Sequence, residues 1–471
     1  MFFCRADPSS FGSSRVSRTI LWLLTLVPFA WLVLLVCKYA VPVPFQDQWE
    51  LVPLLQKSYE GRVTLEDLWA QHNEHRILFP RLLMLLMARL TGWNIGWEIA
   101  LNVALGAALF GVLTWQIRRT ALELALPGLC WAVPAGSLMV FSISHYENWI
   151  CGWQLQVWLH LLAAVSGIVL LAARPFRWLK FACAGLLGVV ATYSFGDGLV
   201  FWPVGLVVLV AAAARKKERR IGAALWILMS VLVYCSYAWH YQKPARHPSL
   251  ASMFQKPFGY GFYVLQYLGA LCGMGAPAVM GAAGLALLGW SLWKLRKWKP
   301  ADRDASLPYV GLILYSFASA LVTGVGRVGF GADQALSSRY GAMSITFWIS
   351  LVVFLLNTAN ARRGEVTVRP APECPGTHAG PKGAGAALAA SSVVAIVALV
   401  ALNSLLSGGP MKTLSGLQQF GRSALVELAE NPTGRPRTNG LLSLYPKAQI
   451  IKERYSILVR HRLSVFRDTK H

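Results

Sequence analysis

The sequence predicts an all-α protein that crosses a membrane about eleven times. Its 471 residues are 55% hydrophobic and only 14% charged, and the mean hydropathy is +0.48. A water-soluble domain of this size needs far more charge to cover its surface. Apolar runs long enough to cross the hydrocarbon core as a helix, about 20 residues, recur along the chain. The main solvent of this chain is therefore lipid.

The first predicted span is a retained helix. Arg15 and Arg18 precede an uncharged run up to Cys37, which is longer than the apolar part of a signal peptide and has no small-residue cleavage site after it. Two further apolar segments, 77–91 and 259–275, contain Pro, Arg or Gly, which favours surface or partly inserted helices. The predicted spans lie at 19–41, 95–117, 122–141, 153–173, 178–195, 199–214, 221–241, 276–293, 308–325, 340–358 and 384–406.

Basic residues set the expected orientation. Short loops rich in Lys and Arg follow the even-numbered spans, and such loops stay in the cytoplasm. The unusual polar residues then lie on the external side. The expected organisation is a cytoplasmic N-terminus (1–18), a transmembrane domain (19–360) with an external loop (42–94), a cytoplasmic linker (361–383), a last span (384–406) and an external basic tail (407–471).

Charge and cysteine content exclude several classes of partner and site. The net charge of +23 is high enough for a nucleic-acid-binding protein, but in a polytopic chain excess Lys and Arg mark cytoplasmic loops and lipid headgroup contacts. We therefore expect membrane lipids, and no nucleic acid, as partners. The eight cysteines are scattered, mostly through apolar runs, and their spacing indicates neither a disulfide framework nor a zinc motif.

The first external loop holds the densest group of reactive side chains. Asp47 follows the first span directly, where the cavity of a helical bundle would open, and Trp49 two residues later is a predicted substrate contact. A carboxylate there can take a proton from a hydroxyl or amine, so Asp47 is the predicted catalytic base. The alternative, a solvated loop charge, is favoured for Glu60, Glu66 and Asp67 of the same loop.

A run of polar residues later in the same loop predicts substrate contacts. It consists of His72, Asn73, Glu74, His75 and Arg76, just before the predicted surface helix. The histidines are alternatively interfacial side chains. His72, Glu74 and His75 leave a divalent cation possible, but without a fourth ligand we predict no metal site.

The loop from Phe141 to Gln154 is rich in hydrogen-bonding and aromatic groups, which suits sugar binding. Aromatic rings stack on the C–H faces of sugars, while carboxylates and amides bind hydroxyls. The alternative is an aromatic belt at the membrane interface, which explains tryptophans but not the acid and amides. Both interpretations stay open for the predicted contacts Tyr146, Glu147, Asn148, Trp149 and Gln154.

Two arginines flank a later external loop. Arginine near the bilayer is unfavourable unless it is paired or faces water, and its planar fork matches phosphate oxygens. We therefore predict that Arg327 and Arg339 bind phosphate, with snorkelling to the interface as the alternative for Arg339. Tyr340 beside it is a further predicted substrate contact. Asp197, between two glycines, is either the acid of a tight turn or a second carboxylate in the cavity.

With these residues the chain resembles the GT-C superfamily of membrane glycosyltransferases, such as aminoarabinose and protein O-mannosyltransferases. Asp47 matches the acid that follows the first span in that superfamily, and 50–58 and 77–91 match its surface helices. The strings Asp-x-Trp, His-Asn-Glu-His-Arg, Glu-Asn-Trp-x-x-Gly-Trp-Gln and Ser-Arg-Tyr are similar to a group of poorly characterised bacterial membrane proteins placed near it. This chain departs from the better-known pattern in having Gln46-Asp47 in place of a double acid.

The resemblance implies an enzyme of the bacterial inner membrane with an external active site. The donor would be a sugar on a polyprenyl phosphate, and the acceptor a lipid, a glycan or a protein. Arg327, Arg339 and Arg76 would neutralise the leaving phosphate, and Asp47 would act as general base with inversion at the anomeric carbon. The competing interpretations are a transporter or flippase of a lipid-linked polar substrate, a glycan ligase or polymerase, and a non-catalytic receptor or assembly factor.

Overall fold

A computed structural model describes residues 15–212, 217–245, 247–249, 251–273, 275–295, 300–360, 384–431 and 438–467. Within these residues the chain is almost entirely helical, and one two-stranded sheet is present. The predicted all-α fold class is confirmed. The predicted linker at 361–383 and most of the predicted N-terminal segment 1–18 lie outside the described residues.

Among the described residues, eight helices are long and apolar enough to cross a membrane. The chain is therefore a multi-pass membrane protein, but the predicted count of eleven spans is not confirmed. The three remaining predicted spans correspond to α9 (Trp178–Thr192), α10 (Phe201–Ala212) and α14 (Pro277–Leu295). Helices α9 and α10 have only 15 and 12 residues. The eight segments are Thr19–Tyr39, Ile95–Glu123, Pro127–His145, Gly152–Ala172, Lys217–Ala238, Asp302–Phe330, Ser338–Ala359 and Ala384–Glu430.

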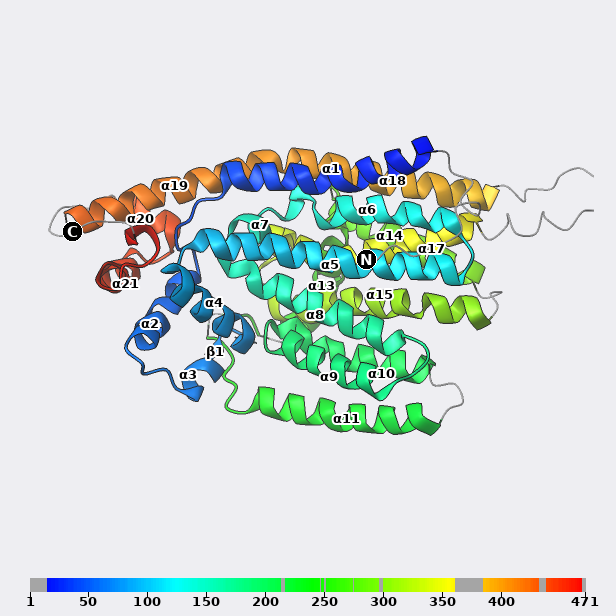
Figure 1. Cartoon of the computed structure of the whole chain (residues 1–471), viewed down its shortest axis with the longest axis horizontal. Coiled ribbons are helices and arrows are strands. Elements are labelled where there is room, and N and C mark those ends of the chain that lie inside the picture. Colours follow the sequence, from blue (N-terminus) through cyan, green and yellow to red (C-terminus); the bar gives the residue numbers. More distant parts are fainter. Residues whose placement is uncertain are drawn as a thin grey trace, which may run out of the picture.

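The main helices of the eight spans form one bundle whose axes run roughly along the longest dimension of the molecule (Figure 1). They are α1 (Arg15–Tyr39), α5 (Ile95–Glu123), α6 (Ala132–Val140), α8 (Leu155–Ala172), α11 (Lys217–Ala238), α15 (Pro300–Arg327), α17 (Ile345–Asn360) and α18 (Ala384–Leu406). The spans that contain α8 and α17 are 78% and 83% buried, whereas those of α1 and α11 are 17% and 22% buried. Helices α8 and α17 therefore form the centre, and α1 and α11 present apolar side chains to lipid.

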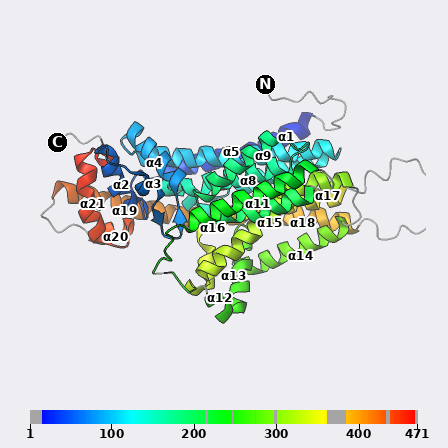
Figure 2. The ribbon, with the colours of Figure 1, turned by 90° about the horizontal axis from the view of Figure 1, so that it is seen from below.

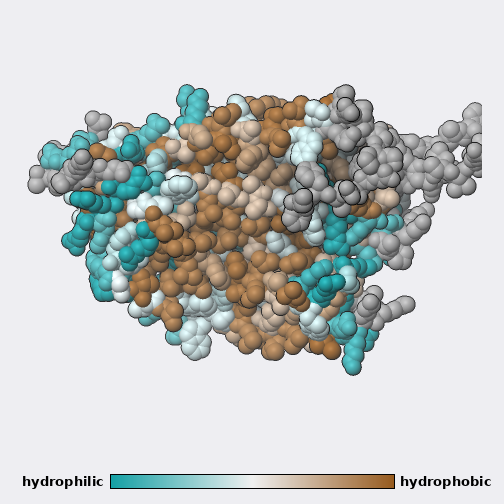
Figure 3. Space-filling view, viewed as in Figure 1, coloured by the Kyte–Doolittle hydropathy of each residue, from teal (hydrophilic) through white to brown (hydrophobic). Residues whose placement is uncertain are grey.

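One end of the bundle carries a cap of short elements, which we call the loop end (Figure 1). Apolar side chains cover the middle of the molecule in Figure 3, while polar side chains gather over the loop end. This distribution fits a bilayer around the middle of the bundle. The elements of the loop end are α2 (Gln48–Tyr59), α3 (Leu65–Trp69), β1 (Gln71–His72), β2 (His75–Arg76), α4 (Leu78–Thr91), α19 (Gly408–Glu430), α20 (Thr438–Leu444) and α21 (Ala448–Arg460).

Local sequence signals explain the elements of the first loop. Helix α3 starts with a capping box, in which Thr64 and Asp67 satisfy each other's backbone N–H groups. Helix α4 ends at Gly92, which adopts the left-handed conformation (φ +63°) that glycine accepts readily. Asn94 then caps α5 by accepting a hydrogen bond from the N–H of Gly96 at 3.0 Å. The predicted surface helices at 50–58 and 77–91 correspond to α2 and α4.

Short helices complete the bundle between the spans. Figure 2 shows α12 (Ser252–Gln255) and α13 (Pro257–Gly269) at the edge of the molecule, with α14 beside α13. The remaining short elements are η1 (Pro127–Trp131), η2 (Ile143–His145), α7 (Glu147–Ile150), η3 (Gly152–Gln154), η4 (Gly196–Val200), η5 (Val328–Phe330), η6 (Ala332–Leu336), α16 (Ser338–Gly341), η7 (Ala342–Ser344) and η9 (Ser464–Phe466).

Helices α13 and α14 pack with their backbones in close approach. A Cβ atom built on Gly281 of α14 would overlap the carbonyl oxygen of Leu265 in α13. Gly289 of the same helix has no atom within 4 Å of its Cβ position among the described residues. Small residues permit such close helix contacts where lipid supplies no hydrophobic driving force between helices.

We expect Gly281→Ala to destabilise the protein, because the backbones of α13 and α14 must separate to admit the methyl group. Overpacking of this kind typically lowers stability by about 1–3 kcal/mol. Gly289→Ala is the matched control and should leave stability unchanged or raised, because alanine is the better helix former. Thermal unfolding of both variants in lipid nanodiscs measures the difference, and equal Tm values for the two would contradict the predicted packing.

Candidate functional site

The hairpin β1–β2 presents the predicted His-Asn-Glu-His-Arg run at the centre of the loop end. His72 and His75 pair directly across its two strands. Asn73 at the turn has φ +49°, a left-handed conformation that asparagine tolerates better than most residues. The hairpin therefore holds His72, Asn73, Glu74 and His75 close together, as the sequence predicted for a shared site.

Arg76 anchors this hairpin to the rest of the protein. Its guanidinium is buried and donates to the backbone oxygens of Trp69 at 2.9 Å, Tyr237 at 2.8 Å and Trp239. It also lies over the rings of Trp69 and Tyr237. Because backbone carbonyls occupy its donors, Arg76 has a structural role. This corrects the prediction that Arg76 binds the phosphate.

Asp47 lies immediately before α2 and pairs with the hairpin. One of its carboxylate oxygens is 3.4 Å from Nε2 of His72. Burial by itself raises the pKa of Asp47, but the hydrogen bond and charge of His72 and the charges of Arg339 and His75 together hold this pKa below its usual value. The carboxylate is therefore ionised at neutral pH and ready to accept a proton.

Glu74 is the centre of a second group of charges. Its carboxylate forms an ion pair with Arg327 and lies 3.4 Å from Nε2 of both His75 and His247. Burial raises the pKa of Glu74, while His75, Arg327 and His247 lower it, and the net pKa is below its usual value. Arg327 thus already has a carboxylate partner. It also lies over the ring of Phe330, with 5.8 Å between the guanidinium carbon and the ring centre.

His75 is neutral in the folded protein. Burial lowers its pKa to about 4. Its Nδ1 accepts a hydrogen bond from the N–H of Gly196 at 2.9 Å, which places the remaining ring proton on Nε2, facing Glu74. The ring stacks on Phe195 with 4.3 Å between ring centres. His75 therefore connects the hairpin to η4, which carries Asp197.

Arg339 is the candidate cation without an ion-pair partner among the described residues. Its Nε is buried and makes no hydrogen bond within that part of the chain. The guanidinium lies in the electrostatic field of Asp47, Glu147 and Glu74. Its backbone oxygen accepts a hydrogen bond from the amide nitrogen of Asn148 at 3.0 Å. The 141–154 loop and the 327–340 segment therefore meet beside Asp47.

The predicted sugar-binding tryptophans are part of the core. Trp49 and Trp149 are fully buried. Their indole nitrogens donate to the backbone oxygens of Pro44 and Ser142, each at 3.0 Å, and Trp149 stacks on Trp158 with 4.2 Å between ring centres. A ring without exposed surface cannot stack on a sugar. The structure thus corrects the predicted substrate role of both residues, which is packing instead.

The other predicted contacts lie at different depths around the site. Tyr146 and Glu147 are half-buried, and Gln154 is buried in η3. Tyr340 is buried next to Arg339, and its hydroxyl accepts a hydrogen bond from Gln334 at 3.3 Å. All four belong to segments that meet near Arg339 and the hairpin, so their predicted substrate contacts remain predictions.

Asp197 is buried in η4 and does not merely close an exposed turn. Its carboxylate accepts a hydrogen bond from Thr323 of α15 at 3.2 Å, and its backbone oxygen lies 3.5 Å from the hydroxyl of Tyr315. The sequence left a turn role and a cavity role open. The observed contacts tie η4 to α15 and place a second acid beneath Glu74 and Arg327, which both influence it electrostatically.

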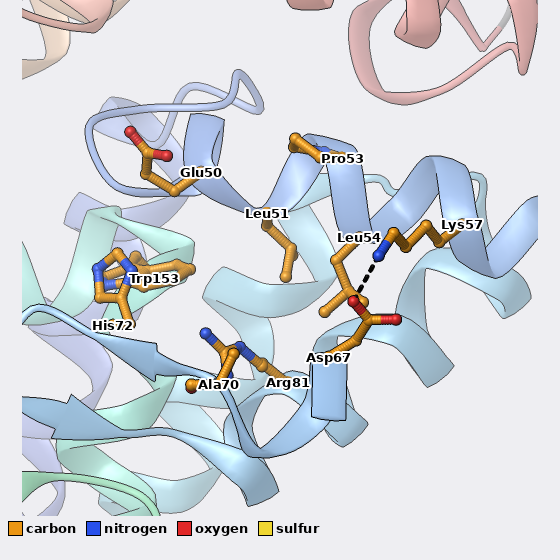
Figure 4. A pocket seen from close by; sticks show the side chains of 10 residues that line it. All are labelled: Glu50, Leu51, Pro53, Leu54, Lys57, Asp67, Ala70, His72, Arg81 and Trp153. Carbon is orange, nitrogen blue, oxygen red and sulfur yellow. Dashed lines mark hydrogen bonds and ion pairs between the residues drawn. The ribbon is translucent and has the colours of Figure 1, made fainter. Parts of the chain in front are cut away.

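A pocket of about 170 Å³ opens between α2, α3, the hairpin and α4. Figure 4 shows His72 and Trp153 together on one side of it and the ion pair between Lys57 and Asp67 on the other. His72 thus touches both the pocket and Asp47. The indole nitrogen of Trp153 is buried and has no hydrogen-bond partner among the described residues.

Two supporting residues were missed by the sequence analysis. Glu98 of α5 is buried and accepts hydrogen bonds from Gln48 at 2.6 Å and from Trp93 at 3.0 Å. It therefore holds the residue that follows Asp47. An acid inside an apolar run was the available signal for Glu98. His247 gave no signal, because its approach to Glu74 depends on the tertiary fold.

The described residues contain no group of three or more His, Cys, Asp or Glu side chains arranged to hold a metal ion. His72 and His75 instead face separate carboxylates, Asp47 and Glu74.

Stability should fall between pH 6.5 and pH 4 because of His75. Its folded pKa, about 4, is below the ordinary 6.5, so the unfolded chain binds the proton first as the pH drops. The stabilisation is complete above pH 6.5, declines towards pH 4 and changes no further below it. We expect His75→Gln, which cannot be protonated, to show a shallower decline of Tm in this window. Identical pH profiles for the variant and the wild type would contradict the assignment.

Compared with protein-family models, curated proteins and solved structures, the chain gives no match. What the site does is therefore inferred from its own side chains.

Proposed function

We propose that the protein is a membrane glycosyltransferase that moves a sugar from a polyprenyl-phosphate donor to a lipid, glycan or protein acceptor. The observation that carries the proposal is that the ionised Asp47 lies in the electrostatic field of Arg339, a half-buried arginine with no ion-pair partner among the described residues. A base for the attacking group and a cation for the leaving group are what such a transfer requires.

In the proposed reaction, a hydroxyl or amine of the acceptor attacks the anomeric carbon of the donor sugar. The bond from that carbon to the phosphate oxygen breaks, and the polyprenyl phosphate leaves with the bonding electron pair. Asp47 takes the proton of the attacking group, and attack from the opposite face inverts the anomeric carbon. Positioning both substrates in one site makes the step effectively unimolecular, which lowers the barrier substantially.

The two arginines have different proposed tasks. Arg339 has a free donor and would bind the phosphate as negative charge develops on it. Arg327 is paired with Glu74, so the phosphate would have to compete with that carboxylate for its guanidinium. Glu74 therefore weakens the attraction of Arg327 for the phosphate. The pocket lined by His72 and Trp153 is the proposed site for the acceptor group, because His72 also contacts Asp47.

The proposed location is the bacterial inner membrane, with the loop end on the external face. The basic loops of the sequence support this orientation. A flippase would use charged residues along a path through the bundle, whereas the charged groups of this site are gathered at one end.

We expect Asp47→Asn to abolish transfer, because an amide cannot accept the proton, while the protein still inserts and unfolds at a similar temperature. The matched control is Glu66→Gln, an equivalent change at an exposed acid of the same loop. The measurement compares lipid-linked sugars and surface glycans in cells carrying the wild type, either variant or a deletion. Accumulated donor with Asp47→Asn supports transfer, accumulation confined to the cytoplasmic leaflet favours a flippase, and unchanged glycans would sink the proposal.

We expect Arg339→Gln to lower kcat/KM for the lipid-linked donor by about 100-fold, the usual loss when a charge-stabilising donor is removed. Arg62→Gln is the control, since Arg62 pairs with Glu60 on the exposed surface of the same end of the molecule. Transfer assays with reconstituted protein and donor lipid extracted from the deletion cells provide the comparison. Equal losses for both variants would mean that Arg339 has no special relation to the phosphate.

A further inference from the structure

The C-terminal segment 438–467 lies against the first loop. Helix α19 continues the direction of α18, and α20, α21 and η9 then return towards α2 and α4 at the loop end (Figure 1). Helix α21 packs on α2, and η9 follows α21. The buried side chains of this segment, such as Leu441, Leu444, Ile451, Leu458 and Phe466, show that it is an integral part of the fold.

The segment holds the entry to the first loop, directly before the candidate base. The N–H of Gln46 donates to the backbone oxygen of Leu444 at 2.7 Å. Gln46 has φ +52°, a left-handed conformation that is unfavourable for a residue with a side chain. That conformation sets the direction in which the chain enters Asp47, and the bond to Leu444 compensates for part of its strain.

Arg454 of α21 holds the first turn of α2. Its guanidinium donates to the backbone oxygen of Trp49 at 2.6 Å and to the carboxylate of Glu50 at 3.0 Å. The hydroxyl of Tyr445 donates to the other oxygen of the same carboxylate. The two residues that follow Gln48 in α2 are thus fixed by charge-assisted bonds from the C-terminal segment.

The same segment also holds the exit of the first loop. The N–H of Ser464 donates to the backbone oxygen of Gly92 at 2.8 Å, just after α4. The ring of His461 lies against that of Tyr59, at the end of α2, with 5.4 Å between their centres. The loop from Gln46 to Gly92 is therefore attached at both ends.

We infer that Arg454, together with Tyr445 and the backbone of Leu444, positions Asp47 for the reaction. The segment acts as a clasp that fixes the start of α2, so the distance and direction from Asp47 to the acceptor depend on residues at the other end of the chain. Arg454 is a positioning residue, since it contacts Trp49 and Glu50 and not the reacting atoms. This inference rests on the proposed function only where it concerns the rate of transfer.

The attachment itself is tested by hydrogen exchange on full-length protein in lipid nanodiscs. In Arg454→Ala, amide exchange in peptides covering 45–50 should be about ten-fold faster or more, because two bonds to a charged donor are lost. Peptides covering 86–93 should be unchanged, since Ser464 still holds Gly92. Arg454→Lys keeps a charge near Glu50 and should be intermediate. Lys452→Ala, at an exposed position of the same helix, is the matched control.

The positioning role is tested by transfer kinetics with donor lipid extracted from deletion cells. Arg454→Ala should lower kcat by about 100-fold, the scale of a small displacement of a reacting group, while KM for the donor is unchanged because Arg339 is not moved. Arg454→Lys should recover part of kcat.

Two results would overturn the inference. Unchanged exchange at 45–50 would show that the C-terminal segment does not hold the start of α2. Faster exchange with an undiminished kcat would show that this attachment does not position Asp47. If Asp47→Asn itself leaves transfer intact, the proposed function fails, and the exchange measurement still decides whether the clasp exists.

Discussion

A lipid bilayer offers the backbone no hydrogen-bond partner, and this constraint shapes every part of the protein. Within the apolar band the chain is helical, because a helix satisfies its own N–H and C=O groups. Irregular backbone, such as the hairpin of residues 71–76 and the turn at Gly92, lies at the loop end. Irregular backbone of this kind allows reactive side chains from several helices to come close together. The candidate site therefore gathers at this end, from segments that are far apart in the sequence.

The charges of the site are arranged so that each acid has a defined partner. Asp47 faces His72, and Glu74 faces Arg327, His75 and His247. Arg339 has no ion-pair partner of its own within the described part of the chain. Its guanidinium interacts electrostatically with both Asp47 and Glu74. This arrangement separates an ionised acid from a free cation without leaving either one isolated at the edge of the bilayer, where an isolated charge is costly. This arrangement is the basis on which we propose a transfer reaction.

The sequence predicted the helical fold, the surface helices α2 and α4, and the grouping of His72 to His75, because hydropathy and local composition determine these features. The predicted count of eleven spans is not confirmed, because some apolar stretches, such as that of α9, form helices shorter than a span. The sequence could not separate Trp149, a core residue, from an interfacial aromatic, because both give the same local pattern. The structural roles of Arg76 and Glu98 could not be predicted from the local sequence either. The partners of both come from distant segments, and only the tertiary fold brings them together.

The clasp has a consequence for how the protein is made. The bond from Arg454 to Trp49 joins residues 405 positions apart, so at about 5–20 residues per second the ribosome completes α2 roughly 20–80 s before its partner emerges. During that interval the first loop is already outside the membrane, in the proposed orientation, without the contacts that fix it. A chain that ends after α18 but before Leu444 has all the long helices of the bundle and lacks the contacts that close this end. In such products the first loop is an exposed segment, which is the kind of site that proteases cleave first.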